Sequence, residues 1–163
     1  MPRFDPEAIL RALEANGVRY VLIGGLAATL HGSPLRTGDA DICPAEDPDN
    51  LDRLACALNE IKARIRTEDA PEGLAFACDR RFLQQVDLLN LSTVFGDLDL
   101  SFRPAGTTGY DDLCQHVERY DLDGLTVPVA ALEDVIRSKE AADRPKDRAA
   151  LPTLRRLLVE RRK

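Results

Sequence analysis

The stretch YVLIGGLAATLHGSPLRTGDADICP, residues 20–44, indicates how this chain folds. An apolar run over residues 20–23 predicts a buried strand that ends at the pair Gly24-Gly25. The small and apolar residues 26–30 are typical of a short helix, and the turn formers that follow predict a loop. The pattern therefore predicts a strand, a glycine turn and a short helix that lead into a second strand.

Two aspartates, Asp39 and Asp41, open that second strand two positions apart. On a strand, side chains two positions apart project from the same face. Two like charges about 4 Å apart repel by roughly 4 kcal/mol at an effective dielectric constant of 20. A divalent cation between the carboxylates would relieve this repulsion, and carboxylate oxygens are the hard ligands that Mg²⁺ prefers. The pair therefore predicts a site for Mg²⁺ or Mn²⁺.

The paired glycines let the backbone approach a phosphate closely, and the helix after them offers free N–H groups at its positive end. Strand, Gly24-Gly25, short helix and Asp39-x-Asp41, with thirteen residues between Gly25 and Asp39, resemble the signature of the nucleotidyltransferase superfamily. The likeness is to small bacterial members of the AbiEii and MenT toxin types. The alternative interpretation is an ordinary strand–helix turn with glycines for tight packing and solvated aspartates.

The resemblance implies a third carboxylate on a neighbouring strand. Residues 86–92 and 98–102 read as two strands of a hairpin around a glycine turn. Asp99 is the favoured third acid because it stands between two leucines, where a charge needs a partner. Asp97 shares its face but lies beside the turn, and Asp87 lies near the start of the other strand, so both remain alternatives.

The resemblance also implies a nucleoside triphosphate (NTP) site. Residues expected to contact its phosphates are Gly24, Gly25, Arg36, Thr37 and Lys139. Lys139 belongs to the segment KEAADRPKD, which is similar to a family element in which a lysine that faces the active site precedes an aspartate, here Asp147. The alternative for this lysine is a solvated helix end.

The remaining patterns place helices around this core. Asp5-Pro6 predicts the start of a first helix, and the spacing of apolar residues predicts a long helix over 49–65. We expect a short helix over 110–117, a last strand over 125–129, and C-terminal helices separated by Pro145. The predicted fold is α/β: a polymerase beta-like nucleotidyltransferase core with a small mixed sheet. A single domain would span 1–163, with the core over 1–129 and a helical part over 130–163.

Composition limits the alternatives. The chain has 163 residues, 44% of them hydrophobic, and no apolar run that approaches a membrane span. The N-terminus lacks the apolar segment of a signal peptide, so we expect a cytoplasmic protein without a membrane partner. The four cysteines form no CxxC pair, which argues against a zinc site.

The expected reaction is transfer of a nucleotidyl group from an NTP to a hydroxyl acceptor with release of pyrophosphate. The acceptor stays open between an RNA or tRNA end, a protein hydroxyl and a small antibiotic. The first two would make the chain the toxin of a toxin–antitoxin pair with a cognate antitoxin as partner. The net charge of −6 argues weakly against a general nucleic-acid binder. The alternative function is a non-catalytic module that binds nucleotide or a regulatory partner.

Overall fold

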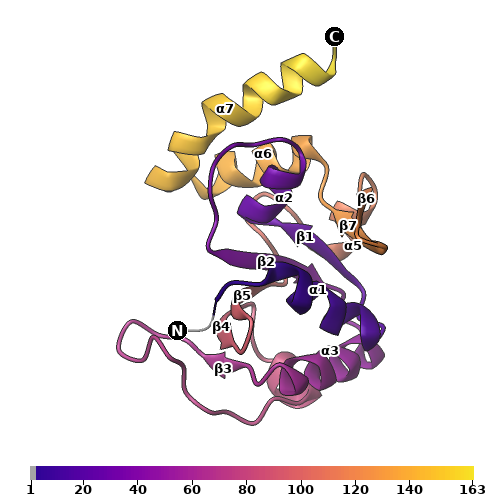
Figure 1. The fold of residues 1–163 in the computed structure, drawn as a ribbon, viewed down its shortest axis with the longest axis vertical. Helices are drawn as coiled ribbons and strands as arrows, with labels where there is room; N and C mark the ends of the chain where they lie inside the picture. Colours follow the sequence, from indigo (N-terminus) through magenta and orange to yellow (C-terminus); the bar gives the residue numbers. More distant parts are fainter. Residues whose placement is uncertain (1–2) are drawn as a thin grey trace.

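The computed structural model describes residues 3–163 and is built on one mixed sheet (Figure 1). Over the described residues, the strand order is β3-β4-β5-β2-β1-β7-β6. The strands are β1 Tyr20–Ile23, β2 Asp39–Pro44, β3 Arg64–Ile65, β4 Leu88–Thr93, β5 Gly96–Ser101, β6 Glu118–Leu122 and β7 Leu125–Val129. β2 pairs antiparallel with β1 and parallel with β5, which places the two aspartate-bearing strands side by side at the centre of the sheet.

Helices lie on both sides of this sheet. They are α1 Pro6–Ala15, α2 Gly24–Leu30, α3 Pro48–Glu60, α4 Arg80–Leu83, α5 Tyr110–Cys114, α6 Leu132–Ala142 and α7 Pro145–Arg161. α6 contacts both α2 and α7, whereas α3 contacts α1 and α4. Figure 1 shows the α6–α7 pair at one end of the molecule and α3 at the other. The mixed α/β fold with C-terminal helices is as predicted, while the division into a core and a helical part stays a prediction.

Local sequence explains why these helices begin where they do. Asp5 caps α1 by accepting a hydrogen bond from the Ala8 N–H, and Asp47 caps α3 through the Asn50 N–H. A proline occupies the first turn of each helix, where a missing N–H costs nothing. The apolar face of each helix is buried against the sheet and its neighbours, so both helices are amphipathic in the way that the spacing predicted.

The long helix expected over 49–65 is wrong at its end. α3 stops at Glu60, because Lys62 adopts a left-handed conformation with φ of 56° that reverses the chain. Ile65, which continued the helical spacing, instead pairs with Leu91 in the sheet. The sequence pattern also missed strand β6, which pairs antiparallel with β7 at the edge.

The C-terminal helices differ in detail from the prediction. α6 ends at Ala142, the following Asp143 is left-handed with φ of 50°, and Pro145 opens α7 rather than stopping α6. Pro152 lies inside α7 on its exposed side, where water can satisfy the carbonyl that proline leaves unpaired. The helix expected over 110–117 ends at Cys114. In residues 3–163, no helix is both long and apolar enough to cross a bilayer.

Candidate active site

Three carboxylates meet on the two central strands. Parallel pairing of β2 with β5 sets Asp41 opposite Asp99, and Asp39 opposite Asp97. One oxygen from each of Asp39, Asp41 and Asp99 lies within 4.8 Å of the other two. All three side chains are partly exposed, so the cluster opens to solvent. The structure thus brings together the three acids that the sequence singled out as a metal site, although no ligand role follows from position alone.

An arginine that sequence analysis did not select sits against this cluster. Arg66 Nη2 donates to Asp99 Oδ1 at 2.9 Å, and its Nη1 lies 3.3 Å from Asp97 Oδ1. The same Nη1 donates to the Leu91 carbonyl at 2.7 Å, which fixes the guanidinium. Arg66 follows the two-residue strand β3, which has no sequence signal of its own, so only the fold could reveal this contact.

The two other candidates for the third acid lie elsewhere. Asp97 is on the same face of β5 but is more exposed than Asp99, with 39% against 15% of its side chain accessible. Asp87 precedes β4, is paired with Arg103 at 2.7 Å, and has an 81% exposed side chain. Asp99 is therefore the acid that the structure sets beside Asp39 and Asp41.

Crowding of the carboxylates disfavours their ionisation. Burial raises the pKa of Asp41 to about 7, and the charges of Asp39 and Asp99 act in the same direction. Burial also raises the pKa of Asp99 to about 6, although the charge of Arg66 partly opposes it. Both shifts have the sign expected for acids that share a site without enough counter-charge. Burial is thus the largest cause of both shifts, and the neighbouring carboxylates add to it.

The glycine pair lies directly beside the acids. Gly24 has φ of +69°, and a Cβ atom there would lie 2.5 Å from Asp41 Oδ2. A Cβ atom on Gly25 would lie 3.0 Å from both Cβ and Oγ1 of Thr37. Thr37 Oγ1 in turn donates to the Asp39 main-chain oxygen at 3.1 Å, and lies 3.2 Å from Asp39 Oδ1. Helix α2 starts at Gly24, beside Asp41, and no side chain caps its first N–H groups.

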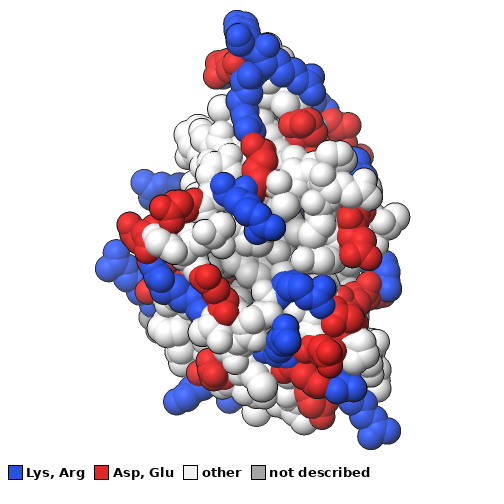
Figure 2. All heavy atoms as spheres, turned by 90° about the vertical axis from the view of Figure 1, so that its right-hand side faces the viewer, with Lys and Arg blue, Asp and Glu red and all other residues white. Residues whose placement is uncertain are grey.

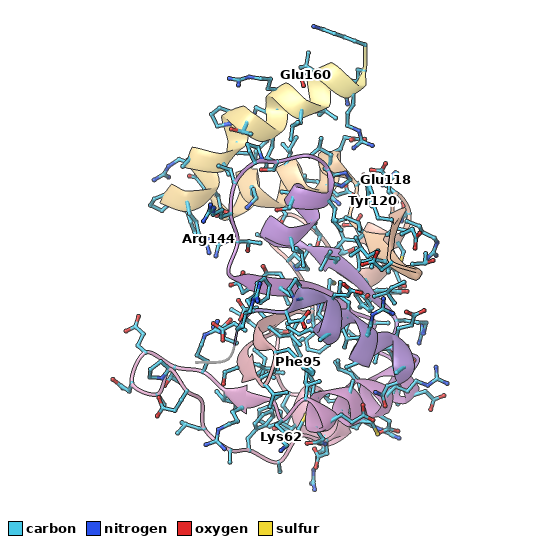
Figure 3. All side chains as sticks on the ribbon, in the orientation of Figure 1. Lys62, Phe95, Glu118, Tyr120, Arg144 and Glu160 are labelled. Atoms are coloured by element: carbon cyan, nitrogen blue, oxygen red, sulfur yellow. The ribbon has the colours of Figure 1, made fainter. Side chains whose placement is uncertain are left out.

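Positive charge reaches the acids from the junction of α6 and α7. Lys139 Nζ lies 3.6 Å from Asp147 Oδ1, and the positive charges of Lys146 and Lys139 lower the pKa of Asp41 against its burial. Asp147 is fully buried, and its burial would raise its pKa, but hydrogen bonds from Arg144 keep that pKa low. Figure 3 shows Arg144 at this junction.

The expected phosphate contacts are thus unequally placed. Lys139 is close enough to Asp41 to influence its ionisation, while Arg36 is exposed on the loop between α2 and β2. Sequence analysis overlooked Lys146 and Arg144, whose charges also interact with Asp41. Both lie inside the KEAADRPKD segment already selected for Lys139, so the other basic residues of that segment could have been chosen from the sequence as well.

Comparison with known proteins agrees with this geometry. No family model and no curated protein sequence matches the chain. Among solved structures, a lincomycin-bound lincosamide antibiotic adenylyltransferase, LnuA, superposes with a TM-score of 0.63 at 16% identity, covering 96% of this chain and 99% of that one. A candidate nucleotidyltransferase from Thermotoga maritima, TM1012, superposes with a TM-score of 0.56 at 19% identity, covering 98% and 97%. The chain has a nucleotidyltransferase fold.

Within the nucleotidyltransferase fold, likeness to the AbiEii and MenT types rests on the sequence motifs alone. At identities of 16% and 19%, the structural likeness shows a shared fold and does not show a shared reaction. The roles of the acids, the glycines and Lys139 therefore have to be argued from their geometry in this chain.

We predict that Asp41→Asn makes the metal-free protein more stable at alkaline pH. The folded-state pKa of about 7 exceeds the ordinary 3.8, so the stability tied to this proton is complete below pH 3.8 and lost as pH rises through 7. In EDTA, the melting temperature of wild type should fall more than that of Asp41→Asn between pH 5 and pH 8. Each kcal/mol relieved corresponds to about 2–4 °C in a chain of this size. Parallel pH profiles for the two proteins would contradict the crowding of Asp41.

We predict that Gly24→Ala is destabilising and weakens any response to Mg²⁺. A left-handed alanine costs about 1–2 kcal/mol, and its methyl group would also collide with Asp41 Oδ2. Gly38→Ala is the matched control, because a Cβ atom there meets nothing within 4 Å. Urea unfolding and melting with and without Mg²⁺ measure both effects. Equal behaviour of the two variants would mean that Gly24 does not fix Asp41.

Proposed function

We propose that the chain is a Mg²⁺- or Mn²⁺-dependent nucleotidyltransferase that uses an NTP as substrate. The observation that carries the proposal is the cluster of Asp39, Asp41 and Asp99, whose oxygens lie within 4.8 Å of one another. The cluster faces the uncapped start of α2 and the basic junction of α6 and α7. Acids, free N–H groups and fixed positive charges around one point are the combination that a metal-bound triphosphate requires.

The donor set suits a hard divalent cation. Three carboxylates offer the oxygen ligands that Mg²⁺ and Mn²⁺ take. Burial, and after it the neighbouring carboxylates, raise the pKa values of Asp41 and Asp99, and a bound cation would oppose both shifts. Asp39, Asp41 and Asp99 would hold the ion, which when bound supplies charge stabilisation to the phosphoryl group in transfer.

Each protein group then has a definite task. Gly24 and Gly25 let Asp41 and Thr37 pack directly against the start of α2, where the backbone of the two glycines would contact the triphosphate. Thr37 fixes the orientation of Asp39 through its hydroxyl. Lys139 places a charge toward the pyrophosphate that leaves, whereas Arg36 is free to meet the outer phosphates from its exposed loop. The acceptor oxygen bonds to the α-phosphorus, the bond from that phosphorus to the leaving oxygen breaks, and the hydroxyl proton passes to an acid of the cluster.

The choice of acceptor is a further part of the proposal. A role as the toxin of a toxin–antitoxin pair, with RNA, tRNA or protein as acceptor and an antitoxin as partner, is supported by the motif likeness to AbiEii and MenT types. A small-antibiotic acceptor is supported by the structural likeness to LnuA, which was solved with lincomycin. Incubation with α-labelled NTP, Mg²⁺ and each of total RNA, cell protein and lincomycin separates these acceptors.

One observation favours the non-catalytic alternative. The guanidinium of Arg66 already balances Asp99, the proposed third acid, at 2.9 Å. A module that only binds nucleotide could keep this ion pair permanently, while an enzyme must have the Asp99 oxygens accessible to the metal. Nucleotide-dependent stabilisation without transfer of label to any acceptor would favour the binding module.

We predict that the acids divide into essential and dispensable residues. A ligand that binds only the folded state stabilises it by about 2.7 kcal/mol at a hundredfold excess over Kd, so millimolar Mg²⁺ should raise the melting temperature. The double variant Asp39→Asn, Asp41→Asn should abolish this rise, and Asp99→Asn should abolish transfer of label from α-labelled NTP. Asp97→Asn and Asp87→Asn are the matched controls and should keep most transfer. A dead Asp97→Asn beside an active Asp99→Asn would overturn the assignment.

We predict that Lys139→Met folds normally, still responds to Mg²⁺, and loses most transfer. Methionine retains the packing of the lysine stem while removing the charge. Loss of one donor aimed at developing charge costs roughly 3–4 kcal/mol of barrier, a factor of about 10² to 10³ in rate. Asp147 remains paired with Arg144 in this variant, so the fold keeps its main ion pair. Turnover close to wild type would return Lys139 to a structural role as the partner of Asp147.

A further inference from the structure

A cavity of about 840 Å³ opens beside the acid cluster and has no part in the roles assigned above. Pockets that bind small molecules have volumes of about 300–1,000 Å³ and mostly apolar walls. The apolar side chains around this cavity come from the N-terminal segment, the chain around β3 and the β4–β5 turn: Phe4, Ala63, Pro71, Ala75, Phe76 and Val94. Its size and walls suit a compact molecule with substantial apolar surface.

The wall beside the hairpin is fixed by backbone contacts. The Asp5 N–H donates to the Phe95 carbonyl at 2.8 Å, which ties the N-terminal segment to the β4–β5 turn. Gly96 lets Phe4 approach so closely that a Cβ atom there would lie 3.0 Å from the Phe4 Cα atom. Figure 3 labels Phe95 at this turn and Lys62 near the other wall. The cavity is therefore formed in the absence of any occupant.

The cavity shares its border with the acids. Gly38, which precedes Asp39, and Asp97, which pairs with Asp39 across β2 and β5, both line it. Arg66 joins the two regions, because it contacts Asp97 and Asp99 with one guanidinium. The glycine pair and Lys139 approach Asp41 from β1 and α6, whereas the cavity is lined by Gly38 and Asp97. A molecule in the cavity would thus approach the acids from another side than the proposed triphosphate, and the two could be bound together.

The charges around the cavity indicate what it can hold. The lining includes two basic side chains, Lys62 and Arg64, and two acidic ones, Glu72 and Asp97. An RNA acceptor would need several unpaired cations for its phosphates. The basic residues at the end of α7 lie at the opposite end of the molecule from β3 (Figure 1). On the right-hand side of Figure 1, which Figure 2 presents, basic and acidic side chains are interspersed. A neutral or singly charged molecule fits this border better than a polyanion.

We propose that this cavity binds the acceptor, and that the acceptor is a small, largely apolar molecule with a hydroxyl group. The inference rests on the proposed nucleotidyl transfer and names its substrate class. The hydroxyl oxygen of the bound molecule forms the bond to the α-phosphorus of the NTP, pyrophosphate leaves with the electrons of the broken bond, and an acid of the cluster takes the proton. The product is a nucleotidylated small molecule.

The test compares a variant that fills the cavity with a matched variant outside it. Ala75→Trp places an indole in the wall, while Ala77→Trp adds the same group to the same exposed loop away from the lining. Val94→Asp, at the exposed hairpin turn, is a second cavity variant that introduces charge instead of volume. Each full-length protein is titrated with the neutral fluorophore N-phenyl-1-naphthylamine, and its melting temperature is measured with Mg²⁺ and ATP.

We expect saturable fluorophore binding to wild type and Ala77→Trp, and binding at least tenfold weaker in both cavity variants. The melting response to Mg²⁺ and ATP should be the same in all four proteins. Hydroxyl-bearing compounds that displace the fluorophore should accept label from α-labelled ATP with wild type and not with Ala75→Trp.

Two results would overturn the proposal. One is fluorophore binding that is absent, or equal in wild type and Ala75→Trp. The other is label transferred to total RNA at equal rates by wild type and Ala75→Trp. A wild type that does not respond to Mg²⁺ and ATP would instead refute nucleotidyl transfer, a result that the fluorophore titration does not influence.

Discussion

Electrostatic repulsion among three carboxylates is the constraint on which the rest of this structure depends. Asp39 and Asp41 share one face of β2, and parallel pairing with β5 brings Asp99 to the same point. Backbone hydrogen bonds of the central strands hold the acids there although burial and mutual charge disfavour their ionisation. The sheet therefore stores an unfavourable arrangement that a cation can relieve, which is a physical reason for expecting one.

Basic side chains approach the three acids from two different sides. Arg66 balances Asp99 and Asp97 from β3, while the lysines at the junction of α6 and α7 act on Asp41. Asp147 holds Lys139 and Arg144 in place from a fully buried position. These cations lie around the acids without filling the space between them, so positive charge is present at the border and still lacking at the centre.

In the proposed reaction, the two substrates would approach the acids from different sides. The glycine pair, the start of α2 and Lys139 surround the part of the cluster near Asp41, where a triphosphate finds N–H groups and charge. The largely apolar cavity is lined by Asp97 and by Gly38, which precedes Asp39, and its walls carry both basic and acidic side chains. Two substrates of different chemistry would thus meet at one set of acids from two sides, which is what an in-line transfer between them requires.

The sequence by itself predicted the central part of the fold and favoured the three acids that the structure brings together. Strand, glycine pair and Asp-x-Asp are local patterns, and the position of Asp99 between two leucines makes it the better choice over Asp97. Each depends on neighbours within a few residues, which a single sequence displays. Only the tertiary structure decided the end of α3, strand β6, the contact of Arg66 with Asp99 and the cavity beside Asp97. Arg66 and Asp99 are 33 residues apart, and the cavity walls come from segments as distant in the chain as Phe4, Gly38 and Asp97. Such features arise from strand pairing over long sequence distances, for which local periodicity holds no signal.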